Sequence, residues 1–387
     1  MKNITIITPF FYPEPISTGK FNTEMVLALK EKGCTVTVFC FHPFYPEWKI
    51  EKSDEQLDGV KIFRGGKHIK FTKNATVRRI ILELSFTFFI LRNLTKIKKN
   101  TDIVIPVFPP SLAFYIVRYF LKKKIQCVGI VHDLQEIYAN QKRGILNKII
   151  AKGIHHVEKK TYQYCDKLIF LSNEMKEVAQ NTYQLIPSKL KVQYPFITIN
   201  KEHTTNDLET LLPNNKQHIV YSGALGEKQN PKELVEIFDY CSKTLDNVLF
   251  HVFSQGTFFE ALKEKNTNKN IQFHKLVPKK NIEELYSKST IQIVPQLKGT
   301  SKGSLPSKLP NLLVSGCNVL CITDEGSEIE KLFKKYEIET VITTWDKRKI
   351  KELFEKILKK ETINEKQIKV SEQLFKIEYM VDTIIKP

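Results

Sequence analysis

The sequence lacks the short motifs that bind common cofactors and metals. No GxGxxG follows the first apolar run, which disfavours a nicotinamide-dependent enzyme, and STGK at 17–20 lacks the upstream glycine of a P-loop. HExxH and other metal-ligand spacings are also missing. We therefore expect neither a resident cofactor nor an obligatory metal.

Paired cysteines and long apolar runs are missing as well. The seven cysteines form no CxxC pair, and several lie in strand-like runs, so we expect reduced, buried thiols in a cytosolic protein. No cationic segment and apolar h-region precede the first strand, and secretion is not expected. The apolar stretch 80–94, IILELSFTFFILRNL, is interrupted by Glu83 and falls short of the ~20 apolar residues that span a bilayer.

Positive charge is abundant, and it is concentrated in one half of the chain. The formal net charge is +18, and residues 1–195 hold 31 Lys and Arg against 16 Asp and Glu. Within 61–124 the count is 15 basic residues to 2 acidic ones. This skew predicts an anionic partner for the N-terminal half. Because basic residues flank 80–94, that stretch is compatible with an interfacial membrane helix and also with a buried core helix. Nucleic acid is disfavoured, since no zinc-finger or RNP-like motif is present.

Strand and helix patterns alternate along the chain in two series. In the first, apolar runs at 3–8, 35–41, 102–107, 125–131 and 167–172 alternate with helical patterns at 21–32, 76–98, 111–122, 145–164 and 173–181. A second series of five strands and five helices begins at 218, and helical patterns at 347–361 and 365–385 follow it. This alternation predicts parallel sheets that are covered by helices on both faces.

The 387 residues are too many for one ordinary core, and the polar, Pro- and Asn-marked segment 191–217 is the expected linker. We expect an α/β protein with two doubly wound, Rossmann-like domains facing a central cleft. The first domain comprises residues 1–195 and is joined by a C-terminal helix at 365–387. The second domain comprises residues 196–364.

The tetrapeptide Phe-Tyr-Pro-Glu occurs twice, at 11–14 and 44–47, each time after a predicted strand. Ligands of doubly wound sheets bind at the carboxyl ends of strands, so we expect both loops to line the cleft, although proline-stiffened turns are the alternative. In the second domain, Ser222-Gly223 ends a strand and Lys228 follows in a loop, which suits an anion. The run 299–304 with Ser307 and Lys308 precedes a helix and also suits a phosphate. Two such loops favour a diphosphate-bearing ligand.

An ordered set of segments resembles a known enzyme family. These segments are YPEPISTGKFNTEM, PFYPEWK, DIVIPVFPPSLA, VHDL, YSGALGEKQNPKELVEIF, VPKKNIEELYSKSTIQIVP and LPSKLPNLLVSG. The chain resembles family 4 (group 1) glycosyltransferases of GT-B fold, and particularly the bacterial branch that builds capsule, O-antigen and colanic-acid repeat units. The resemblance implies retaining transfer of a sugar from a nucleotide-sugar to a hydroxyl, without an obligatory metal. Further implied partners are a polyprenyl-diphosphate-linked saccharide acceptor and the anionic inner face of the cell membrane.

The resemblance also assigns roles to single residues. His132 matches the histidine beside the donor sugar, and Lys228 matches the lysine that neutralises the nucleotide diphosphate. Gly19 lets backbone approach the substrates, and Glu14 and Lys20 are the polar site candidates of the first loop. Pro13 and Pro15 hold the entry of this loop. Gly223, Ser307, Lys308 and Asn311 complete the expected nucleotide-sugar site.

Three positions depart from the family pattern. Gly303 and Asn311 stand where the family has two glutamates, and Ala224 replaces an arginine. Lys308 can take over the missing cationic role. These changes leave open a sugar-nucleotide epimerase of the same fold and an inactive partner in a polysaccharide assembly. Liposome flotation and nucleotide-sugar turnover separate these alternatives, and thermal-shift screening of nucleoside diphosphates identifies the donor base.

Overall fold

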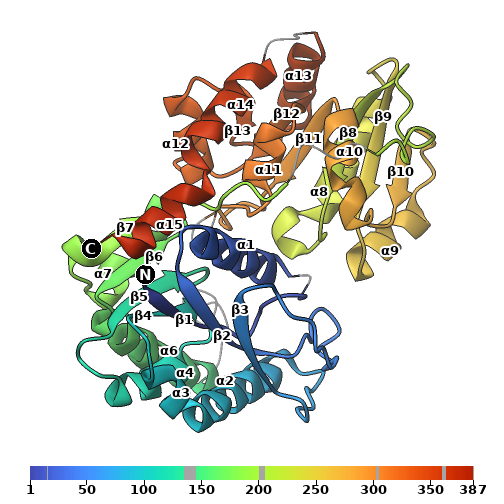
Figure 1. The fold of residues 1–387 in the computed structure, drawn as a ribbon. Coiled ribbons are helices and arrows are strands. Elements are labelled where there is room, and N and C mark those ends of the chain that lie inside the picture. The colour runs from blue at the N-terminus through green and yellow to red at the C-terminus, as the bar shows by residue number, and fades with distance from the viewer. Residues whose placement is uncertain (15, 135–144, 200–204, 302–304, 360–362, 387) are drawn as a thin grey trace. The chain divides into compact units, whose positions relative to one another are not determined.

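A computed structural model gives the fold of residues 1–387 and describes all of them except 15, 135–144, 200–204, 302–304, 360–362 and 387 (Figure 1). The chain divides into two compact units. Unit 1 comprises Met1–Pro195 and Ile377–Pro387, and unit 2 comprises Phe196–Lys376.

Unit 1 is built on a seven-stranded parallel sheet in the order β3-β2-β1-β4-β5-β6-β7. Its strands are β1 (Asn3–Ile7), β2 (Thr35–Phe41), β3 (Val60–Gly65), β4 (Ile103–Phe108), β5 (Gln126–Val131), β6 (Lys167–Phe170) and β7 (Leu190–Val192). Its helices are α1 (Ser17–Glu31), α2 (Ala75–Arg92), α3 (Leu94–Lys98), α4 (Leu112–Val117), α6 (Ile145–Tyr164), α7 (Asn173–Tyr183) and α15 (Ile377–Ile385). All six residues of β4 are buried, as expected for a central strand with helices on both faces.

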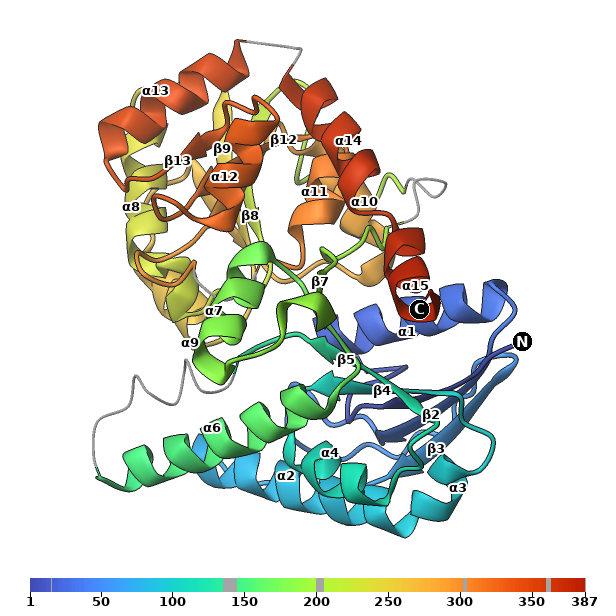
Figure 2. The ribbon, with the colours of Figure 1, turned by 90° about the vertical axis from the view of Figure 1, so that its left-hand side faces the viewer.

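The two faces of this sheet carry different helices. Helix α1 packs against α15 on one side, and α2, α4 and α6 lie together on the other (Figure 2). The core under α2, α4 and α6 contains Phe41, Phe86, Phe108 and Phe114. The Asn74 side chain accepts hydrogen bonds from the N–H groups of Thr76 and Val77 and thereby caps α2.

Unit 2 has a six-stranded parallel sheet in the order β10-β9-β8-β11-β12-β13. Its strands are β8 (Gln217–Ser222), β9 (Val248–Phe253), β10 (Ile271–His274), β11 (Ile291–Pro295), β12 (Asn318–Ile322) and β13 (Val341–Ile342). Its helices are α8 (Pro231–Ser242), α9 (Thr257–Lys265), α10 (Ile282–Lys288), α11 (Leu309–Val314), α12 (Glu328–Lys335), α13 (Lys347–Leu358) and α14 (Ile363–Leu374). Side chains of α8 and α13 share one core cluster, whereas α14 packs against α11 and β12.

The predicted α/β class with two parallel, doubly wound sheets is confirmed, and the predicted strands and helices are found within a few residues. Some details differ. Strands β3, β7 and β13 were not predicted, and the helix expected at 76–98 ends at Arg92 before a separate α3. The helix expected at 365–385 is two helices, α14 in unit 2 and α15 in unit 1. No helix among the described residues is long and apolar enough to cross a membrane.

Three histidines on adjacent strands of unit 2 form a hydrogen-bonded chain. His218 Nδ1 lies 3.0 Å from His251 Nε2, and His251 Nδ1 lies 3.1 Å from His274 Nε2. His218 Nε2 is 3.0 Å from the Pro213 carbonyl, which fixes that nitrogen as a donor when the ring is neutral. Burial lowers the pKa of His251 to about 3 and that of His274 to about 4.

These three hydrogen-bonded histidines predict that unit 2 loses stability in mild acid. The histidine pKa values lie below the unfolded value of about 6.5, so the unfolded state binds more protons as the pH falls below 6.5. His251 alone should lower the free energy of unfolding by about 2 kcal/mol between pH 6.5 and pH 5. Urea unfolding can be followed at Trp345 of unit 2 in a Trp48→Phe background.

His251→Leu should flatten this pH dependence, and His68→Gln, which changes an exposed histidine of unit 1, should leave it unchanged. Equal free energies at pH 7 and pH 5 in the parent protein would contradict the assignment of neutral rings.

Candidate functional site

The two Phe-Tyr-Pro-Glu loops are joined to each other through Glu14. Its carboxylate accepts hydrogen bonds from the backbone N–H of Tyr45 at 2.6 Å and of Phe44 at 3.1 Å. Glu14 is only 4% exposed, and burial raises its pKa to about 7. The carboxylate expected to face a substrate therefore holds the second loop against the first.

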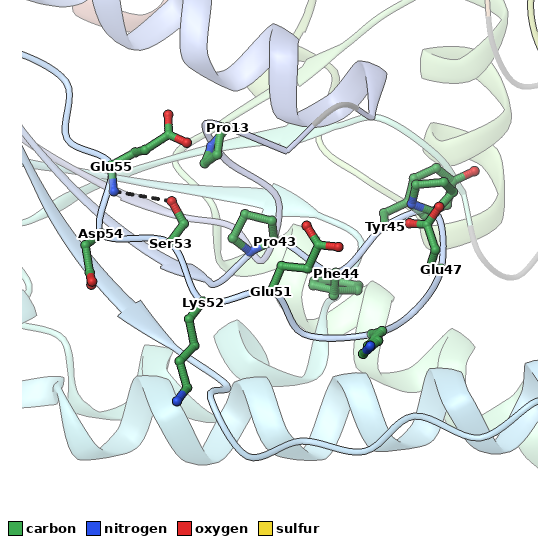
Figure 3. Close-up of a pocket in the computed structure, with 12 residues that line it drawn as sticks. Pro13, Pro43, Phe44, Tyr45, Glu47, Glu51, Lys52, Ser53, Asp54 and Glu55 are labelled. Carbon is green, nitrogen blue, oxygen red and sulfur yellow. Dashed lines mark hydrogen bonds between the residues drawn. The ribbon is translucent and has the colours of Figure 1, made fainter.

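Both loops line a cavity of about 510 Å³ at this end of the sheet (Figure 3). Pro13 comes from the first loop, and Phe44, Tyr45, Pro46 and Glu47 come from the second. Four carboxylates surround the cavity, at Glu47, Glu51, Asp54 and Glu55, within a unit that is otherwise basic. Residues of both loops thus line one cavity within unit 1, whereas their expected place in the interdomain cleft stays a prediction.

Gly19 and Lys20 lie in the first turn of α1. A Cβ atom on Gly19 would be 2.9 Å from the Glu14 carbonyl oxygen and 3.0 Å from the Glu14 Cβ. A side chain at this position would therefore clash with the backbone of the first loop, which is one physical reason for glycine here. The backbone N–H of Lys20 donates to the Ile16 carbonyl at 3.0 Å. Pro15 lies outside the described residues.

His132 follows β5 and lines a second, larger cavity of unit 1, with a volume of about 590 Å³. We call this cavity the α2–α6 pocket, because residues of both helices line it. The His132 ring packs edge-on against Phe21, with 4.6 Å between ring centroids. Its Nε2 is buried and has no hydrogen-bond partner among the described residues. Burial lowers the pKa of His132 to about 4, so the ring is neutral at physiological pH.

The pocket also contains residues that the sequence interpretation did not single out. Arg78 stacks its guanidinium carbon 4.1 Å from the centre of the Trp48 ring, and both residues line the pocket. Arg78 was counted only as a flanking charge, and its aromatic partner lies 30 positions away, so no local pattern connects them.

In unit 2 the structure brings Gly223 and Lys308 together at the end of β8. Gly223 has a φ of 129°, and the atom nearest to a Cβ placed there would be Lys308 Nζ, at 4.0 Å. The Lys308 ammonium donates to the Ser222 carbonyl at 2.9 Å and lies 4.5 Å from the centre of the Tyr221 ring. Burial lowers the pKa of Lys308 to about 8. A glycine backbone beside a cation is suited to an anionic ligand.

The other residues expected at this site have different surroundings. Lys228 is exposed on a short 3-10 helix, Glu227–Gln229, and its carbonyl accepts from the Leu297 N–H at 2.7 Å. Ser307 is exposed, next to Lys308. The Asn311 side chain accepts from Thr198 N–H at 2.7 Å and donates to Thr198 Oγ1 at 3.0 Å, so a ribose would have to displace these bonds. The carbonyl of Ala224 accepts a hydrogen bond from the Tyr221 hydroxyl at 2.6 Å.

The Ser/Thr/Gly-rich run before α11 does not present free N–H groups where the structure describes it. Asp324 accepts hydrogen bonds from Gly299 N–H at 2.8 Å, from Ser301 N–H at 3.2 Å and from Ser301 Oγ at 2.7 Å. These bonds lower the Asp324 pKa against the opposing effect of its burial. The backbone N–H groups of 299–301 are therefore already paired, and residues 302–304 lie outside the described structure. Gly303 lies outside the described residues.

No group of three or more His, Cys, Asp or Glu side chains in the described parts of the chain is arranged to hold a metal ion.

Comparison with known proteins identifies both units. The model of Glycosyltransferase Family 4 matches residues 18–201, and the model of Glycosyl transferases group 1 matches residues 203–374. The chain is 24% identical over 352 residues to the putative colanic acid biosynthesis glycosyl transferase WcaI of Escherichia coli K12, and the alignment covers 84% of each protein.

Solved structures show the same fold at low identity. WaaG, a glycosyltransferase involved in lipopolysaccharide biosynthesis, superposes with a TM-score of 0.72 at 14% identity and covers 100% of both chains. Sucrose-phosphate synthase from Thermosynechococcus elongatus has a TM-score of 0.72 at 13% identity, covering 98% of this chain and 96% of its own. With two parallel-sheet units and both family models matched in order, the chain belongs to the family 4 (group 1) glycosyltransferases of GT-B fold.

Proposed function

We propose that this glycosyltransferase moves a sugar, with retention, from a nucleotide-sugar to a lipid-linked saccharide at an anionic membrane face, in surface polysaccharide biosynthesis. The similarity to WcaI supports the pathway class. The basic, partly apolar outer face of unit 1 supports the membrane partner, and it is the observation that carries the proposal.

The donor half of the reaction is assigned to unit 2. Transfer breaks the bond between the sugar C1 and the diphosphate oxygen and forms a bond from C1 to the acceptor oxygen, while the acceptor hydroxyl loses its proton. Negative charge develops on the leaving diphosphate. Fixed cations at Lys308 and Lys228, together with the Gly223 backbone, stabilise this charge without a metal.

The membrane-facing half is assigned to α2. Val77, Ile80, Leu84 and Phe88 recur at helical spacing along its outer side, and all four are exposed, Leu84 at 57% and Phe88 at 62%. We call these four residues the α2 stripe. Arg92 lies 5.5 Å over the Phe88 ring, and the exposed Arg79 and Lys96 are on the same helix or just beyond it. Apolar side chains bordered by cations are typical of a helix lying in a membrane interface.

Two of the phenylalanines in the 80–94 stretch do not belong to this surface. Phe86 is 1% exposed and is part of the core cluster, and Phe89 packs over Gly65, where a Cβ would approach its ring to 2.3 Å. A test that changed Phe86, Phe88 and Phe89 together would therefore damage the core, because a helix turns 100° per residue and places Phe86 and Phe88 on opposite sides.

The membrane proposal predicts that a Leu84→Ser/Phe88→Ser variant loses binding to anionic liposomes. Each side chain contributes roughly 1.5 kcal/mol on burial in an apolar phase, so the affinity should fall about 100-fold. Cosedimentation with phosphatidylglycerol vesicles measures this, and raised salt should weaken binding of the unaltered protein.

Ile186→Ser/Phe258→Ser is the matched control, because both side chains are exposed outside α2. The two double variants should have equal melting temperatures. If the unaltered protein ignores anionic vesicles at low salt, the membrane proposal fails and a soluble acceptor becomes the better candidate.

A further inference from the structure

The second Phe-Tyr-Pro-Glu loop contributes to the walls of both cavities of unit 1. Tyr45 lines the cavity of about 510 Å³ and also the α2–α6 pocket. Trp48, which follows directly after the tetrapeptide, lines the α2–α6 pocket together with His132. The position of the second loop therefore helps to set the shape of the pocket that contains His132.

Trp48 is held in a backbone conformation that bulky residues rarely adopt. Its φ is 56°, in the left-handed region. Contacts of its ring hold it there, because the Arg78 guanidinium carbon lies 4.1 Å from the ring centre and the Phe71 ring packs edge-on with 5.2 Å between centroids. A strained residue persists only while its surroundings fix it. Trp48 is therefore the residue of this loop that should respond first when the loop is loosened.

Glu14 supplies the buried contact at the start of the same loop. The backbone N–H groups of Phe44 and Tyr45 both donate to its carboxylate, and the Phe44 carbonyl accepts from the Lys49 N–H at 3.1 Å, so these bonds bracket Trp48. Because both donors to Glu14 are backbone groups, weakening these bonds moves the chain itself and not a single side chain.

The negative charge of Glu14 is poorly tolerated at this position. Burial raises the pKa of Glu14 from 4.5 to about 7, and the carboxylates of Glu51 and Glu47 on the second loop raise it further, against the effect of the two N–H donors (Figure 3). Other ionisable groups around Glu14 are Cys40 of β2, whose thiol has a pKa raised by burial to about 12, and Lys20, in the turn of α1 that packs against Glu14.

The direction of the pH effect follows from this raised pKa. The buried carboxyl group binds its proton more tightly than a carboxyl group in solvent does. Its contribution to the closed arrangement of the loop is therefore fully present below pH 4.5 and is lost as the pH rises through 7. Above pH 7 a buried charge lies beside two further carboxylates, and the closed arrangement is weakest.

We propose that Glu14 is a positioning residue whose protonation sets the place of Tyr45 and Trp48 in the wall of the α2–α6 pocket. With the proton bound, the second loop is held and the pocket keeps its shape beside His132. When the proton is lost, repulsion between the carboxylates loosens the loop and Trp48 leaves its strained conformation. This pH-sensitive wall goes beyond sugar transfer, and it does not depend on which molecule the pocket binds.

The test follows the fluorescence of Trp48 in the full chain with Trp345→Phe, which removes the other of the two tryptophans. Acrylamide quenching of Trp48 should increase about twofold between pH 5.5 and pH 8.5, with a midpoint at or just below pH 7. Glu14→Gln keeps the shape and the accepting oxygen of a protonated carboxyl group, so its Trp48 should be quenched weakly at every pH.

Two further variants test the charges around Glu14. Glu51→Gln removes a negative neighbour and should move the midpoint to lower pH, because ionisation of Glu14 then costs less. Glu31→Gln is the matched control, since this glutamate is exposed at the far end of α1, and it should leave the midpoint unchanged.

Three results would overturn the proposal. Quenching that is constant over this pH range would exclude a pH-sensitive wall, and a transition that persists in Glu14→Gln would assign it to another group, such as His42 or His68. Stronger quenching at pH 5.5 than at pH 8.5 would mean that the ionised carboxylate, and not the acid, holds the loop. If Glu14→Gln does not fold, Glu51→Gln decides: a midpoint moved to lower pH supports the proposal, and an unmoved midpoint rejects it.

Discussion

Replacing Lys308 by methionine is expected to lower kcat/KM for sugar transfer by roughly 100-fold, or about 3 kcal/mol of transition-state stabilisation. Lys308 is the cation that the structure places 4.0 Å from a Cβ on Gly223, at the end of β8. Methionine keeps the length of the side chain and removes the charge, so the fold should survive. The measurement is turnover of a nucleotide-sugar panel, together with calorimetric binding of nucleoside diphosphates.

The pH dependence of binding separates Lys308 from other cations. Its pKa of about 8 in the free protein means that it loses its proton as the pH rises through 8. Because a bound diphosphate favours the charged form, affinity should fall up to tenfold per pH unit above 8. Lys308→Arg keeps its charge at these pH values and should abolish the break near pH 8.

Lys228→Ala should impair transfer to a similar extent if Lys228 also reaches the diphosphate, and Lys232→Ala, on the exposed start of α8, is the matched control. Turnover of the Lys308→Met protein within a few-fold of the parent would remove Lys308 from the site. A Lys308→Met protein that melted far below the parent would make its role structural.

His132→Ala is expected to reduce transfer at least 100-fold while nucleoside diphosphates bind as before, since their proposed site lies in unit 2. The buried Nε2 of His132 has no partner among the described residues, and the ring lines the α2–α6 pocket. Its pKa of about 4 keeps the imidazole neutral, so it would act as a hydrogen-bonding group and not as a cation. Single-turnover kinetics and a pH–rate profile measure this role.

Because His132 stays neutral, the pH–rate profiles of the parent and of His132→Ala should have the same shape between pH 6 and pH 7. His68→Ala controls for the loss of an exposed imidazole. A stable His132→Ala protein with normal turnover would contradict the role, and an unstable one that still binds and transfers at the normal rate per folded molecule would make His132 a packing residue.

The fold could be predicted well from sequence because the central strands are nearly continuous apolar runs. Strand β3, VKIFRG, was missed because it is an edge strand whose residues after Val60 are mostly half-buried, so its apolar residues are diluted with charged ones. The division of the 365–385 segment was missed for another reason. Both halves are amphipathic, and only tertiary contacts, such as those of α14 with α11 and β12, show that the first packs in unit 2.

The site could be predicted only in part. The position of His132 after β5 and of Gly223 after β8 follows from the alternation of strands and helices. The role of Glu14 could not be predicted, because it depends on a contact with a loop about 30 residues away, and the role of Gly19 depends on how closely the loop at Glu14 returns to α1. Helical periodicity was sufficient to predict that Phe86 and Phe88 lie on different faces of the helix, since they are two positions apart.

The return of α15 to unit 1 has a consequence for the order in which the chain folds during synthesis. Met380, Val381 and Ile384 of α15 are fully buried beside α1, and Lys167 donates to the carbonyls of Thr383 and Lys386 at 2.8 and 2.6 Å. Unit 2 is one continuous stretch of sequence and can complete its sheet as it leaves the ribosome. Unit 1 begins first but is completed last, because its α1 face stays uncovered until residues 377–385 have been made. A nascent chain stalled before residue 377 would therefore expose apolar surface on its N-terminal domain and make that domain a substrate for chaperones.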